Sequence, residues 1–121
     1  MLARLQDAQE EVAIMPITRH FRATVWTRAQ KDSRYREAML IEAINELLTG
    51  DLGAGKAMLR DYVNATITFD GLAQAYSKPS KSLQRMLGPR SNPLAESVFG
   101  IIKVLQDVEH VHLQVKVAKV A

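Results

Sequence analysis

Residues that end or cap helices divide the chain into short segments, and this division constrains the fold more than any other feature. Gly50 can adopt the left-handed conformation that ends a helix, and Asp51 directly after it can cap the next one. Asn92-Pro93 supplies a cap followed by a proline at the first helical position. Because apolar residues recur at helical spacing between such breaks, the sequence predicts an all-α domain of several short helices.

Three helices are expected after the first proline. The first covers about residues 18–30 and carries Trp26, which we expect in the core. The second is capped by Asp32 or Ser33, and the third by Asp51. Their apolar stripes are Phe21, Val25 and Ala29 in the first helix, Leu40, Ala43, Ile44 and Leu47 in the second, and Leu52, Leu59, Tyr62 and Val63 in the third.

Two shorter helices and a longer one are expected in the second half of the chain. Thr68 can cap the first short helix, over residues 69–76, and the residues 77–80 form a turn into the second, which ends near Leu87 before Gly88-Pro89. The longer helix begins at the Asn92 cap. Its core-facing stripe is Leu94, Val98, Ile101, Leu105 and Val108.

The periodicity changes at the end of the chain. From Val111 to Val117, apolar residues alternate with His112, Gln114 and Lys116, which is typical of a β-strand with one solvent-exposed face. A single strand is not stable alone, so this one must pair with a second copy of the chain, with a partner's sheet, or with an unidentified segment. It is our candidate for a dimer or partner contact through backbone pairing.

These boundaries divide the chain into four parts. Residues 1–15 are an N-terminal extension that is either helical or disordered. A helical lead-in over residues 16–66 precedes a core over residues 67–109, and a C-terminal strand and tail covers residues 110–121.

Charge is distributed unevenly, although the formal net charge is only +3. Residues 16–36 hold six cations against Asp32 alone, and residues 37–70 carry a net charge of −4. Residues 71–95 carry a net charge of +4 from Lys78, Lys81, Arg85 and Arg90, with no acidic residue. A basic stretch suits a polyanionic partner, although a solvated helix face also produces one. The first basic block either forms ion pairs within the protein or contacts the flanking backbone of a nucleic acid.

The two short helices and their turn have the pattern of a helix-turn-helix, whose second helix enters the major groove of DNA. Apolar anchors on both sides of the turn are Leu72, Ala73, Tyr76, Leu83, Met86 and Leu87. Arginine and lysine can bond guanine, glutamine can bond adenine, and serine can bond phosphate or base. The candidate DNA-binding residues are Ser80, Lys81, Ser82, Gln84 and Arg85 on the second helix, with Lys78 and Arg90 contacting phosphates at its ends.

The stretch LAQAYSKPSKSLQRML over residues 72–87, followed by Asn92-Pro93 and the helix over residues 97–105, resembles the Cro/lambda-repressor-type helix-turn-helix. More narrowly, residues 38–117 are similar to addiction-module antidote proteins, which are relatives of HigA-type antitoxins. That family carries a glycine and an aliphatic residue in the turn, where this chain has Ser77 and Lys78. The turn must therefore form without the residue that most easily adopts a positive φ.

The resemblance implies a lambda-repressor-like domain and a transcriptional regulator. Such a protein binds a palindromic double-stranded DNA operator as a homodimer and represses its own operon. It is often encoded beside a small RelE-like toxin that it neutralises, as the antitoxin of a type II toxin-antitoxin module. Two alternatives are a stand-alone helix-turn-helix repressor without a toxin partner and a protein-interaction module that does not bind DNA.

Other classes of function fit the residues less well. The chain has no cysteine and only three histidines, so we expect no metal site. Residues 50–57 are close to the phosphate-binding P-loop motif. That motif requires a serine or threonine after its lysine, because the hydroxyl binds magnesium, and this chain has Ala57 there. No serine lies on a glycine-flanked elbow, so we expect no enzyme and no cofactor. Without a signal-peptide core or a membrane span in the sequence, we expect a cytoplasmic protein that does not contact membranes.

Overall fold

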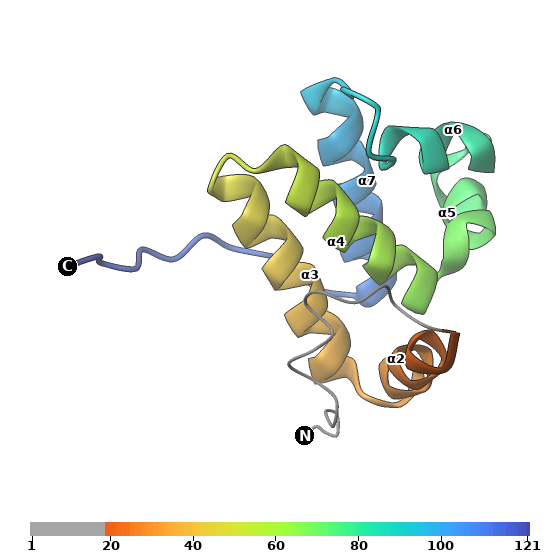
Figure 1. The fold of residues 1–121 in the computed structure, drawn as a ribbon, viewed down its shortest axis with the longest axis horizontal. Helices are drawn as coiled ribbons and strands as arrows, with labels where there is room; N and C mark the ends of the chain where they lie inside the picture. Colours follow the sequence, from red (N-terminus) through yellow and green to blue (C-terminus); the bar gives the residue numbers. More distant parts are fainter. Residues whose placement is uncertain (1–18) are drawn as a thin grey trace.

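The structure is a computed structural model of the chain, and it describes residues 19–121. The helices of this part, shown in Figure 1, are α2 (Arg19–Lys31), α3 (Ser33–Leu48), α4 (Leu52–Ala65), α5 (Thr68–Tyr76), α6 (Ser80–Met86) and α7 (Ala95–Glu109). No strand occurs between residues 19 and 121, so the prediction of an all-α fold is confirmed there. The predicted N-terminal extension, residues 1–15, lies outside the described residues.

Helices α3 and α4 pack side by side as a hairpin, and local signals in the sequence explain both of its ends (Figure 1). Asp32 caps α3, because its carboxylate accepts hydrogen bonds from the backbone N–H groups of Arg34 and Tyr35. Gly50 has a φ of +91°, and Asp51 caps α4 by accepting from the N–H of Ala54 at 2.9 Å. The predicted stop and both predicted caps are therefore confirmed.

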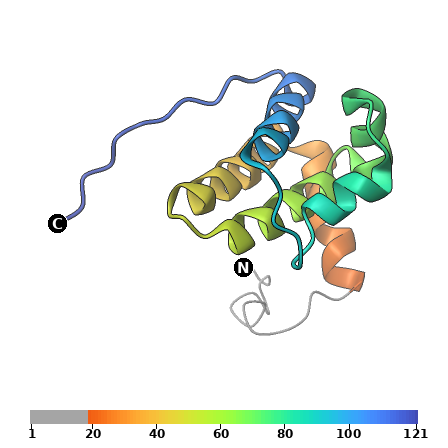
Figure 2. The ribbon, with the colours of Figure 1, turned by 90° about the horizontal axis from the view of Figure 1, so that it is seen from above.

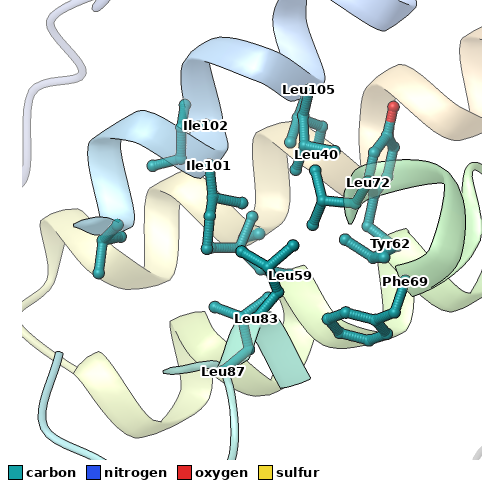
Figure 3. Packing of buried hydrophobic residues seen from close by; sticks show 13 residues of the cluster. Leu40, Leu59, Tyr62, Phe69, Leu72, Leu83, Leu87, Ile101, Ile102 and Leu105 are labelled. Atoms are coloured by element: carbon teal, nitrogen blue, oxygen red, sulfur yellow. The ribbon is translucent and has the colours of Figure 1, made fainter. Parts of the chain in front are cut away.

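One apolar core joins five helices, α3 to α7. Figure 3 shows side chains from all five converging on the same space. Its fully buried leucines and isoleucine are Leu40, Leu59, Leu72, Leu83, Leu87, Ile101 and Leu105. The predicted lead-in and the predicted core therefore share one hydrophobic cluster, in which the two short helices are packed on both sides of their turn.

A buried polar contact ties together helices that are distant in sequence. The side chain of Glu109 at the end of α7 is only 6% exposed, and Arg36 of α3 donates to both its oxygens, at 3.1 and 2.9 Å. The hydroxyl of Tyr62 in α4 donates to the same carboxylate at 2.7 Å. Burial raises the pKa of Tyr62, and Glu109 raises it further, so the phenol stays protonated as a donor.

Helix α2 is attached to this framework at its C-terminal half. Ala29 is fully buried, and its carbonyl accepts from Nη1 of Arg36 at 2.7 Å. Gln30 donates to the carbonyl of Ala65 at 3.0 Å. The prediction that Trp26 lies in the core is wrong: its side chain is 48% exposed, because α2 docks through the face that carries Ala29 and leaves the indole at the surface.

The start of the last helix also differs from the prediction. Helix α7 begins at Ala95 with Leu94 at the cap position, and no side chain caps it, so Asn92 is not the cap. Within the predicted stripe, Val98, Ile101 and Leu105 are buried as expected. Leu94 and Val108 are instead 72% and 43% exposed, because one precedes the helix and the other lies at the edge of its buried face.

The predicted strand from Val111 to Val117 is not present. Residues 111–121 belong to no sheet. Leu113 still packs against the core cluster, and the rest of the tail runs away from the helices (Figures 1 and 2). Strand geometry requires a hydrogen-bonded neighbour, and no segment within residues 19–121 provides one. No helix in the same part of the chain is both long and apolar enough to cross a lipid bilayer.

The contact between Arg36 and Glu109 leads to a stability prediction. Substitution Arg36→Met leaves a buried carboxylate without its charged partner, so the free energy of unfolding should fall by about 2–4 kcal/mol. Urea denaturation followed by circular dichroism measures this loss. The matched control is Lys103→Met, which breaks the 2.7 Å ion pair between Lys103 and Asp107 on the exposed surface of α7. It should change stability by at most about 0.5 kcal/mol, and equal losses in the two variants would contradict the assignment.

Candidate functional site

The turn between α5 and α6 forms without glycine. Ser77 adopts the left-handed conformation, with φ 58° and ψ 41°, and ends α5. The N–H of Lys78 donates to the carbonyl of Ala73 at 3.3 Å, which closes the turn. At the other end, α5 begins at Thr68 and Ile67 holds the cap position, so Thr68 is not the cap as predicted, although its hydroxyl accepts from the N–H of Gly71 at 3.2 Å.

Apolar side chains on the inner side of helix α6 anchor it to the core. Leu83 and Leu87 are fully buried, and Met86 is partly buried against the same cluster. Helix α5 packs in turn on α7 through Tyr76, whose hydroxyl occupies the space of a side chain at Gly100: a Cβ there would overlap that oxygen. The predicted anchors on both sides of the turn are therefore in place.

The outer face of α6 is polar. Lys81, Gln84 and Arg85 are exposed, and their spacing places them together on the side opposite the buried leucines. Ser80 is half-buried, and its hydroxyl accepts from Nε2 of Gln84 at 3.0 Å. Ser82 is also half-buried and lies at the edge of this face. We call the exposed trio of Lys81, Gln84 and Arg85 the α6 face.

Two further predicted cations flank α6. Lys78 lies in the turn before it, with its Nζ 5.5 Å from the centre of the Tyr76 ring. Arg90 is exposed in the loop after it. Within residues 19–121, no carboxylate lies at ion-pair distance from Lys78, Lys81, Arg85 or Arg90. Their positive charge is therefore not neutralised by the part of the protein that the structure describes.

Two cations of α4, not singled out from the sequence, donate hydrogen bonds to the backbone at and after the end of α6. Lys56 of α4 is 3% exposed, and its Nζ donates to the carbonyl of Ser91 at 2.5 Å and to its hydroxyl at 3.3 Å. One turn further along α4, Nη1 of Arg60 donates to the carbonyl of Leu87 at 2.5 Å. Cations favour the negative end of a helix dipole, so Arg60 stabilises the C-terminus of α6 while Lys56 holds the loop after it.

A signal for Lys56 was present in the sequence. It lies four residues after Leu52 and three before Leu59, within the apolar stripe predicted for α4. A lysine in such a stripe must find buried acceptors, and here backbone and hydroxyl oxygens supply them. The hydroxyl of Ser91 in turn donates to the carbonyl of Met86 at 2.7 Å, so a chain of hydrogen bonds runs from α4 to the end of α6.

Two arginines of the first basic block make contacts within the protein. Arg36 pairs with Glu109, and Arg28 lies over the ring of Tyr35 at 4.5 Å. Burial raises the pKa of Asp61, and the positive charges of Arg60 and Arg22 offset part of this rise. Of the two alternatives for this block, contacts inside the protein account for Arg28 and Arg36.

The carboxylates near the C-terminal histidines are also occupied. Glu109 accepts from Arg36 and Tyr62, and Asp107 accepts from Lys103. His110 adopts a left-handed conformation that ends α7. In the part of the chain that the structure describes, no three histidine, aspartate or glutamate side chains are grouped so that they could hold a metal ion.

Comparisons with known proteins place the chain in no established group. It matches no protein-family model, and neither the curated proteins nor the solved structures include a significant match. A function must therefore be inferred from the geometry of α5, α6 and the turn between them.

The left-handed conformation of Ser77 leads to a prediction for the turn. For a residue with a Cβ this conformation costs about 1–2 kcal/mol, and glycine avoids most of that cost. Substitution Ser77→Gly should therefore raise the free energy of unfolding by about 0.5–1 kcal/mol, measured by urea denaturation. The same substitution within α6, Ser82→Gly, should lower it by about 0.5–1 kcal/mol. A destabilised Ser77→Gly variant would show that the turn has another conformation.

Proposed function

We propose that this protein is a sequence-specific DNA-binding transcriptional regulator. In this proposal α5, its turn and α6 form the helix-turn-helix of a lambda-repressor-like domain, and α6 is the recognition helix. The observation that carries the proposal is the α6 face. Lys81, Gln84 and Arg85 are exposed together on a short helix whose opposite side is fully buried, in a stretch of the chain that holds no acidic residue.

The dimensions and chemistry of α6 suit the major groove. An α-helix with its side chains is about 10–12 Å in diameter, and the groove is about 12 Å wide. Arg85 can donate two hydrogen bonds to O6 and N7 of guanine. The bond from Gln84 to Ser80 uses one N–H of the amide and restricts its rotamer. The second N–H and the carbonyl oxygen of Gln84 remain available for N7 and N6 of adenine.

The cations around the α6 face supply contacts that do not depend on sequence. Lys78 and Arg90 lie just before and just after α6, so they can neutralise phosphates at its two ends and set its register on the duplex. Lys56 and Arg60 face inward and take no part in DNA contact. Their role in the proposal is to hold the end of α6 at a fixed orientation.

The regulator is proposed to act as a homodimer on a palindromic operator and to repress its own operon. Its proposed place in a toxin-antitoxin module is supported by the resemblance of residues 38–117 to addiction-module antidote proteins. Coexpression with the product of the neighbouring open reading frame tests this part. Co-purification with a basic protein of the RelE-like type is the expected result, and a chain that purifies alone would contradict the proposed toxin partner.

The α6 face and its flanking cations should affect DNA binding differently. Substitution Arg85→Ala removes a contact to a base, so affinity for the specific site should fall by about 1–3 kcal/mol with little change on random DNA. Substitution Lys78→Ala removes a phosphate contact, so it should weaken binding to both DNAs and reduce the dependence of log K on log salt by about one unit. Fluorescence anisotropy with labelled duplexes at several salt concentrations measures both effects.

The result that would contradict the base-reading role is an equal loss of affinity on both DNAs after Arg85→Ala. The rival function, a protein-interaction module, is tested with the unmodified protein. Its promoter DNA should be shifted in a gel at low salt, and failure to shift it would favour that rival.

A further inference from the structure

A cavity separates part of α3 from α4. Next to the Gly50 turn the two helices are in close contact, since a Cβ at Gly55 would overlap the side chain of Leu47. Further from the turn, a cavity of about 270 Å³ opens between them, lined from α3 by Tyr35, Ala38, Met39 and Glu42 and from α4 by Met58 and Asp61. The spacing of three and four residues places the α3 side chains on one face, so they form a continuous wall.

The inner part of the cavity is apolar and adaptable. Met39 and Met58 are half-buried, and a methionine thioether adjusts to irregular shapes and makes favourable contacts with aromatic rings. The ring of Tyr35 is held in place by the guanidinium of Arg28, 4.5 Å from its centre. An engineered apolar cavity of about 150 Å³ binds benzene. The cavity between α3 and α4 therefore has room for one ring with a short side chain.

Two carboxylates lie at the rim of the cavity, and the fold does not use them. In the part of the chain that the structure describes, no hydrogen bond or ion pair joins Glu42 or Asp61 to another group. Arg60, which follows Met58 on α4, donates instead to the carbonyl of Leu87. Partial desolvation raises the pKa of Asp61, as expected of a carboxylate beside apolar side chains. A cation that brings its own N–H donors would stabilise both carboxylates.

A second cavity of similar size differs in this respect. It measures about 280 Å³ and lies where α2, α3, α4 and α7 meet. Its polar side chains are bonded to one another or to the backbone: Arg36 and Tyr62 donate to Glu109, and Gln30 donates to the carbonyl of Ala65. These groups hold the helices together. Only the cavity between α3 and α4 combines an apolar interior with carboxylates that lack a partner among the described residues.

We propose that the cavity between α3 and α4 binds a small organic cation, an amine with an aromatic or other apolar body. The ammonium group lies at Glu42 and Asp61, and the body contacts Met39, Met58 and Tyr35. The surrounding segment favours a cation over an anion, because residues 37–70 carry a net charge of −4. A neutral ligand of the same shape would leave the two carboxylates without a charged partner.

This site is separate from the α6 face. Successive residues of an α-helix are about 100° apart around its axis, so Met58 and Asp61 lie on the opposite side of α4 from Lys56 and Arg60. Those two cations hold the end of α6 and the loop after it. The proposal therefore does not rest on DNA binding, and its tests contain no DNA.

Methyl NMR of the full chain with labelled methionine locates the ligand, since the chain has only five methionines. Substitutions Met39→Leu and Met58→Leu assign the signals of the two that line the cavity. The probe is phenethylamine, which is a cation at neutral pH. It should shift both signals saturably, with a dissociation constant in the millimolar range, as expected of so small a ligand. The signal of Met86 in α6 should not move. Equal shifts of all three signals, or none at Met39 and Met58, would overturn the proposal.

A neutral ligand and a charge-removing variant test the role of the two carboxylates. On the native chain, 2-phenylethanol, which has the same ring and chain length without the charge, should bind at least about tenfold more weakly than phenethylamine. The double substitution Glu42→Gln with Asp61→Asn should weaken phenethylamine by a similar factor, so that the two ligands bind alike. Both side chains are exposed at the rim, so the fold should survive, and circular dichroism checks this.

The matched control is Glu96→Gln, which removes an exposed carboxylate of α7 that does not line the cavity. It should leave the affinity for phenethylamine unchanged. Equal affinity of the native chain for the two ligands would contradict a cation site without recourse to any variant. Unchanged binding of phenethylamine to the folded double variant would also rule out Glu42 and Asp61 as its partners.

Discussion

The buried contact of Glu109 with Arg36 and Tyr62 is the interaction on which the arrangement of the helices depends. It joins α3, α4 and α7 through one carboxylate, and Arg36 extends it to α2 by donating to Ala29. A buried carboxylate is costly unless it is paired and hydrogen-bonded, so these helices must keep their mutual positions. Nearer the start of α4, Lys56 and Arg60 satisfy carbonyls at and after the end of α6. Apolar packing supplies the core, and polar contacts on either side of it set the geometry.

This arrangement explains how a helix as short as α6 can present a defined surface. A helix of seven residues is not stable alone in water, so its orientation comes from its neighbours. Leu83 and Leu87 fix it from beneath, and Arg60 fixes its end. The cations near α6 therefore fall into two groups. Lys56 and Arg60 of α4 point inward and donate to backbone oxygens. Lys81 and Arg85 point outward and have no ion pair within the described residues. Such a surface suits recognition of an anion with a fixed shape.

Features set by local chemistry could be predicted from the sequence. The caps at Asp32 and Asp51 and the stop at Gly50 depend only on adjacent residues. Features set by distant contacts could not. Arg36 and Glu109 are 73 residues apart, and no spacing indicates that they meet. Asn92 is a favourable cap, but Ser91 is held by Lys56, and the helix begins only at Ala95. The alternating tail has the preference of a strand, but a strand also needs a neighbour.

The central claim is that α6 reads DNA sequence. The most direct measurement is selection of bound duplexes from a random DNA pool by the full chain, at a salt concentration that suppresses non-specific binding. The expected result is an enriched palindrome with half-sites about one helical turn, or about 10 base pairs, apart. Enrichment of a single half-site would leave recognition by α6 intact and remove the symmetric assembly. A bound pool without any consensus sequence would contradict the claim.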